Sequence, residues 1–94
     1  MARLSIVEIA GPYCGTQTEG EKLYRAIVRH LRANEKVVLD FDNVEIASSS
    51  FFNEVFGLIT EDFGEEILES HISYDSLKPR LQFVLERSQR ATPA

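Results

Sequence analysis

The sequence has 94 residues, which is enough for one domain and no more, and we expect an ordered core over about residues 3–89. Its net charge of −5, from 15 acidic and 10 basic residues, argues against a nucleic acid or an anionic membrane as the partner, because both need concentrated lysine and arginine. A single cysteine excludes an internal disulfide, the N-terminus has no signal-peptide core, and no apolar run is long enough to span a bilayer. We therefore expect one cytoplasmic domain over residues 1–94, as a monomer or a homodimer.

The first third of the chain predicts a strand, a loop and a helix. Residues 4–10 alternate in polarity and are rich in β-branched side chains, which predicts a strand that ends at a Gly-Pro turn. The glycine- and threonine-rich stretch from Gly11 to Gly20 predicts a loop. A helix is expected from about Thr18 to Asn34, because aliphatic side chains recur every four residues at Leu23, Ile27 and Leu31.

The middle of the chain predicts a strand and a strongly apolar helix. Residues 36–42 predict a second strand, and the apolar run within it suits a strand covered on both faces. After a short link, three consecutive serines precede a helix over about residues 51–63, which Gly64 ends. The apolar face of this helix consists of Phe52, Val55, Phe56, Ile59 and Phe63.

The last third predicts a short helical turn over residues 65–70, a third strand over residues 71–74 and a final helix. Ser76 is expected to cap that helix, with Pro79 in its first turn. The complete order is β-α-β-α-turn-β-α. Such alternation predicts an α/β fold, in which a short, mainly parallel sheet carries packed helices.

The segment from Val37 to Gly57 carries most of the functional information. It combines a strand that ends in carboxylates, a short link, and hydroxyl groups at the start of a helix. A helix start has a partial positive charge and unpaired N–H groups, so it favours a phosphoserine or a bound anion. The alternative is that the serines only cap the helix, for which one serine is sufficient.

The same segment resembles the STAS-like family of unknown function, whose members have a strand-Asp-Phe sequence followed by serines, a phenylalanine and an acidic residue that open a helix. The likeness extends over about residues 4–87. The segment is similar, more distantly, to the anti-sigma-factor antagonists, in which Asp-Ser-Ser-Gly opens a helix and the first serine is phosphorylated by a partner kinase. On this chain, that motif puts Ser48 at the aspartate, Ser49 at the phosphorylated serine and Ser50 at the next serine.

The resemblance therefore implies a small STAS-like regulatory module that docks a protein partner, such as an ATPase or a histidine-kinase-like protein. The docking site would be the helix start from Ser48 to Glu54, with phosphorylation as its regulation. Asn53 and Glu54 lie near this helix start and are further candidates for partner contact, although Glu54 equally suits a charge near a helix N-terminus.

Two other candidate sites follow from the residues alone. Asp40 and Asp42 share one face of a strand end, where they could bind a cation or accept hydrogen bonds from nearby loops, and the second role is favoured. Thr16 and Thr18 are candidates for a phosphate site in the Gly11–Gly20 loop, which matches neither of the common nucleotide-binding glycine motifs.

Three classes of function remain open: a regulatory interaction module, a nucleotide- or small-anion-binding domain or minor enzyme subunit that uses the Gly11–Gly20 loop, and a purely structural or oligomerising subunit. The sequence contains no recognisable acid–base pair, metal-ligand spacing or nucleophile–base arrangement. We therefore favour the first class, and we expect no catalytic residues, no metal and no cofactor.

Overall fold

The computed structural model describes the backbone of residues 1–91 and the side chains as far as Ser88. The helices and strands in chain order are β1 (Ala2–Ser5), α1 (Ile6–Ala10), β2 (Tyr13–Cys14), α2 (Gln17–Arg32), β3 (Val37–Asp40), β4 (Ile46–Ala47), α3 (Ser49–Phe63), α4 (Glu66–Ser70), β5 (Ile72–Asp75) and α5 (Pro79–Ala91). The tail expected outside the ordered core, residues 90–94, is helical at residues 90 and 91, which end α5, and its last three residues lie outside the described part of the chain.

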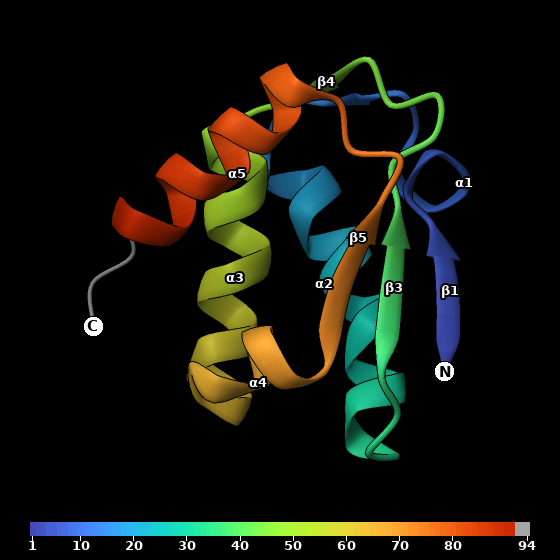
Figure 1. The fold of residues 1–94 in the computed structure, drawn as a ribbon, viewed down its shortest axis with the longest axis vertical. Helices are drawn as coiled ribbons and strands as arrows, with labels where there is room; N and C mark the ends of the chain where they lie inside the picture. Colours follow the sequence, from blue (N-terminus) through green and yellow to red (C-terminus); the bar gives the residue numbers. More distant parts are fainter. Residues whose placement is uncertain (92–94) are drawn as a thin grey trace.

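The described strands form two parallel sheets. The larger sheet has the strand order β1-β3-β5, and the smaller sheet pairs β2 with β4. In Figure 1, α2 runs behind the larger sheet, and α3 lies beside α2. The expected α/β fold, with a short parallel sheet and helices packed on it, is confirmed.

The apolar core lies between the larger sheet and the helices. The predicted face of α3 is buried at Phe52, Val55, Phe56 and Ile59, and only Phe63 at its end is partly exposed. Leu81 and Leu85 of α5 join the same core. None of the helices within residues 1–91 is both long enough and apolar enough to cross a membrane.

The expected strand over residues 4–10 is wrong in its second half, because β1 ends at Ser5 and residues 6–10 form the short helix α1. Ser5 caps this helix, since its hydroxyl accepts a hydrogen bond from the Glu8 N–H at 3.4 Å. Gly11 ends the helix with φ of +88°, and its N–H donates to the Val7 carbonyl. The Ser-x-x-Glu pattern at residues 5–8 is a helix-start signal, but the alternating polarity of residues 4–10 favoured a strand.

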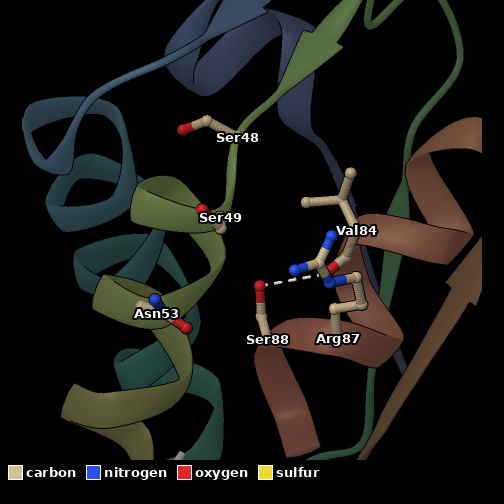
Figure 2. Close-up of a pocket in the computed structure, with 6 residues that line it drawn as sticks. All are labelled: Ser48, Ser49, Asn53, Val84, Arg87 and Ser88. Atoms are coloured by element: carbon tan, nitrogen blue, oxygen red, sulfur yellow. Dashed lines mark hydrogen bonds between the residues drawn. The ribbon is translucent and has the colours of Figure 1, made fainter. Parts of the chain in front are cut away.

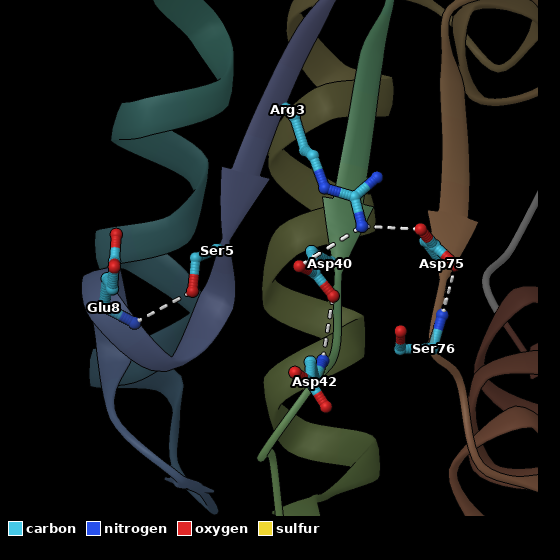
Figure 3. A network of polar contacts seen from close by, with 7 residues as sticks. All are labelled: Arg3, Ser5, Glu8, Asp40, Asp42, Asp75 and Ser76. Atoms are coloured by element: carbon cyan, nitrogen blue, oxygen red, sulfur yellow. Dashed lines mark hydrogen bonds and ion pairs between the residues drawn. The ribbon is translucent and has the colours of Figure 1, made fainter.

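The expectation that the central strand is covered on both faces is also wrong. Val37 and Leu39 point into the core, but Val38 and Asp40 lie on the opposite face and are half-buried. Apart from Val38, this second face carries polar side chains on all three strands. The Arg3 guanidinium from β1 reaches Asp40 of β3 at 3.3 Å and Asp75 of β5 at 2.5 Å (Figure 3). The larger sheet therefore carries helices on one face and an ion-pair cluster on the other.

Two smaller expectations need correction. The Gly11–Gly20 stretch is not all loop, because it contains β2, which pairs with β4 about thirty residues later, and the first turn of α2. Ser76 is not a helix cap, because α5 begins at Pro79. Ser76 instead has φ of +56°, and its N–H donates to the Asp75 carboxylate at 2.8 Å. The expected place of Pro79 in the first turn is confirmed.

Candidate functional site

The three serines have different environments at the start of α3. Ser48 is the cap: its hydroxyl accepts from the Phe51 N–H at 3.2 Å, and its own N–H donates to the Cys14 carbonyl of β2 at 2.9 Å. Ser49 and Ser50 are the first two helical residues, and both are exposed. Capping therefore accounts for Ser48 and leaves the hydroxyl groups of Ser49 and Ser50 available to a ligand or a partner.

A pocket of about 360 Å³ opens between the start of α3 and the second half of α5. In Figure 2, Ser49 and Asn53 lie one turn apart on α3, and the Arg87 guanidinium lies near Val84 on the side of α5 that faces them. The residues that line the pocket are Ser48, Ser49, Asn53, Val84, Arg87 and Ser88. The pocket thus brings together three predicted site residues, Ser48, Ser49 and Asn53. Its other wall consists of α5 residues that the sequence pattern did not indicate as a site.

The α5 wall of the pocket has a defined polarity. The Arg87 guanidinium carbon lies 5.6 Å from the centre of the Phe83 ring, in cation–π geometry. Ser88 is 2% exposed, and its hydroxyl donates to the Val84 carbonyl at 2.9 Å. Of the six lining residues, Arg87 carries a charge and the others are neutral. The pocket is therefore electropositive, and the uncharged first turn of α3 adds the positive end of its dipole.

Two contacts position α5 against the site. The Arg80 guanidinium donates to the Glu45 carbonyl at 2.9 Å and lies 3.6 Å from the Glu45 carboxylate. Because Glu45 directly precedes β4, this contact ties the first turn of α5 to the strand that leads into Ser48. Burial of Leu81 and Leu85 holds the rest of the helix on the core.

The structure separates Ser50 and Glu54 from the pocket. Neither residue lines it, and Glu54 is half-buried against α2. A Cβ atom added to Gly20 of α2 would lie 2.9 Å from the Glu54 Cβ and 2.9 Å from the Phe51 carbonyl oxygen. Glu54 therefore forms part of a close contact between two helices, and Gly20 makes that contact sterically feasible.

The Thr16 hydroxyl and the first N–H groups around it are hydrogen-bonded within the chain itself. The Glu19 carboxylate accepts hydrogen bonds from the Gly15 N–H at 3.2 Å and the Thr16 N–H at 3.0 Å, and also binds the Thr16 hydroxyl at 2.9 Å. Thr16 in turn accepts from the Thr18 N–H at 3.3 Å. These bonds, with that from the Thr16 hydroxyl largest, lower the pKa of Glu19. A carboxylate already sits where a phosphate would bind, which weighs against an anion site at this helix start.

The two aspartates lie away from the pocket lining, at the end of β3. Asp40 accepts from the Asp42 N–H at 3.0 Å and pairs with Arg3, so it holds the turn and the neighbouring strand (Figure 3). The Arg3 hydrogen bond, assisted by the Ser76 N–H, lowers the pKa of Asp75 in the same cluster. Within the described residues, no group of three or more histidine, cysteine or acidic side chains is arranged to hold a metal.

An exposed apolar pair lies on the smaller sheet, next to the start of α3. Tyr13 of β2 and Ile46 of β4 are Cα partners across that sheet, and they are 65% and 50% exposed. Ile46 is two residues before Ser48. Next to Tyr13, Cys14 is fully buried, and burial raises the pKa of its thiol to about 11, which makes this thiol a packing group and not a nucleophile.

The comparisons with known proteins agree with the motif at the start of α3. A family model described as a STAS-like domain of unknown function matches residues 19–82, about two thirds of the chain. The match includes the serine run and ends before Val84, Arg87 and Ser88, so the α5 wall of the pocket lies outside it. No curated protein and no solved structure matches the chain. The chain belongs to the STAS-like domain family of unknown function.

Proposed function

We propose that this protein is a cytoplasmic, non-enzymatic regulatory module that docks a protein partner through the start of α3. The observation that carries the proposal is the pocket between α3 and α5, which Ser49 and Asn53 line with exposed side chains. An ATPase or a histidine-kinase-like protein is the partner that the family resemblance favours.

The surroundings of the pocket suit a protein interface. Interfaces combine exposed aromatic and aliphatic anchors with polar groups and arginine. Here the exposed Tyr13–Ile46 pair lies next to the serine run along the chain, and the exposed Phe83 stacks with Arg87 beyond it. A partner that covers the start of α3 would bury apolar and polar groups together.

Regulation by phosphorylation is part of the proposal, and Ser49 is its most suitable acceptor. The Ser48 hydroxyl is engaged in capping, and Ser50 lies outside the pocket lining. A phosphate on Ser49 would gain from the α3 N-terminus and from Arg87 across the pocket. It would also fill the pocket and place a double negative charge on the proposed interface, so it would release the partner.

The test is affinity purification from native cells with the wild-type chain and with two variants, Ser49→Glu and Ser50→Glu. Both variants add one carboxylate to an exposed position in the first turn of α3, but only Ser49 lines the pocket. We expect Ser49→Glu to reduce recovery of the partner strongly, while Ser50→Glu retains most of it. Equal recovery by all three proteins would contradict docking at the pocket, as would equal loss from both variants.

A further inference from the structure

The positive charge of Arg87 is not neutralised by any of the other side chains that line the pocket. Arg87 is exposed and contacts the Phe83 ring, and no carboxylate among the described side chains lies within ion-pairing distance of it. An arginine guanidinium has five N–H donors in a planar fork, and an aromatic ring against one face leaves the donors at its edge available. In Figure 2 the guanidinium lies on the side of α5 that faces α3.

The opposite wall supplies neutral hydrogen-bonding groups. The Ser49 and Asn53 side chains lie one turn apart on α3, and both line the pocket. The Ser48 hydroxyl accepts a hydrogen bond from the backbone, and the Ser88 hydroxyl donates one to it. We therefore treat these two serines as lining residues and assign them no contact with a ligand. The free donors therefore come from two helices that are not joined in sequence and converge on one space.

We propose that this pocket is a binding site for the phosphate group of a small phosphorylated molecule, held between Arg87 on α5 and Ser49 and Asn53 on α3. Converging donors from two walls suit an anion with three free oxygens better than a planar carboxylate. The volume of about 360 Å³ exceeds that of a phosphate group and lies in the range of small-molecule sites, so it accommodates the rest of such a ligand. The site is distinct from the Gly11–Gly20 stretch, where Glu19 occupies the donors.

This inference goes beyond partner docking and does not depend on it. A bound phosphate would place a ligand-dependent charge at the proposed interface, so the ligand would control access of the partner. Partner recovery and phosphate binding are measured separately, and either proposal can fail while the other stands.

The test is a titration of the full chain with inorganic phosphate, followed by NMR of the backbone amides, the Asn53 side-chain amide and the Arg87 Nε–H. We expect saturable shifts confined to the start of α3 and the second half of α5. Arg87→Gln should weaken phosphate binding at least ~10-fold, because it removes a charge-assisted contact. Arg32→Gln, which removes an exposed arginine from the end of α2, is the matched control and should bind as wild type.

A second variant keeps the test independent of any effect on α5. Asn53→Asp preserves the size of the side chain but places a carboxylate opposite Arg87, so it should abolish phosphate binding while thermal unfolding stays close to wild type. Glycerol 3-phosphate should bind at least as tightly as inorganic phosphate, and glycerol should not bind. Equal shifts in wild type and Arg87→Gln would overturn the proposal. So would shifts centred on the α2 arginines, or acetate binding as tightly as phosphate.

Discussion

The close contact between α2 and α3 at Gly20 helps to position the start of α3, and a substitution at Gly20 tests this contact. Gly20 lies in the first turns of α2 and is buried against α3. A Cβ atom at this position would approach the Phe51 carbonyl oxygen and the Glu54 Cβ to 2.9 Å each. Ordinary contacts of this kind are longer by at least half an ångström, and one of the two atoms belongs to the backbone. Gly20→Ala therefore requires the two helices to move apart.

The magnitude follows from two opposing terms. Alanine is the better helix former by about 1 kcal/mol, which favours the variant. Forcing one methyl group into a packed contact costs typically about 1–3 kcal/mol, because neighbouring groups must shift. At Gly20 the clash is with a backbone oxygen as well as a side chain, so we expect the upper part of that range. The net result should be a loss of about 1–2 kcal/mol in the free energy of unfolding.

Gly57 of α3 provides the matched control, because a Cβ atom there meets no other atom within 4 Å. Gly57→Ala should stabilise the protein by about 0.5–1 kcal/mol through helix propensity alone. Urea unfolding followed by circular dichroism gives both values, and thermal midpoints should shift in opposite directions. If both variants stabilise the protein by the same amount, the close approach of α2 to α3 at Gly20 is refuted.

Two further predictions concern the helix starts. Ser48→Ala should lower the free energy of unfolding by about 1 kcal/mol because it removes the cap of α3, whereas Ser49→Ala should change it by less than about 0.5 kcal/mol; equal losses in urea unfolding would argue against this division of roles. The pKa of Glu19 is lower in the folded chain than its unfolded value, so its contribution to stability is present above the unfolded pKa and is lost as the pH falls through the folded pKa. Glu19→Gln should therefore flatten the acid side of a plot of urea midpoint against pH, and an unchanged slope would contradict the capping geometry at Thr16.

Local sequence signals predicted the two long helices and their ends well. The repeat of Leu23, Ile27 and Leu31 marks the buried face of α2, and all three side chains are buried. Asn34 adopts φ of +58° after α2, and Gly64 adopts φ of +88° after α3. These features depend on residues within a few positions of one another, so the local sequence is sufficient to predict them.

Short elements were predicted poorly, because five residues cannot distinguish a strand from a helix by periodicity. Residues 6–10 alternate like a strand, yet the Ser5 cap and burial of Ile6 make them helical. The two-residue strand β2 depends on β4, and no local pattern announces a partner so distant in sequence. The polar outer face of the larger sheet likewise depends on the Arg3 cluster, which three separate strands assemble.

The sequence by itself determined the family, the order of the longer strands and helices and the place of the serine run at the start of a helix, because each of these depends on neighbouring residues. Tertiary structure decided which of the serines caps the helix, which one lines a pocket, and that Arg87 lies opposite it. Ser49 and Arg87 are nearly forty residues apart, and they line the same pocket only because burial of Leu81 and Leu85 packs α5 against α3. Burial of apolar side chains sets that packing, and the pocket is a consequence of it.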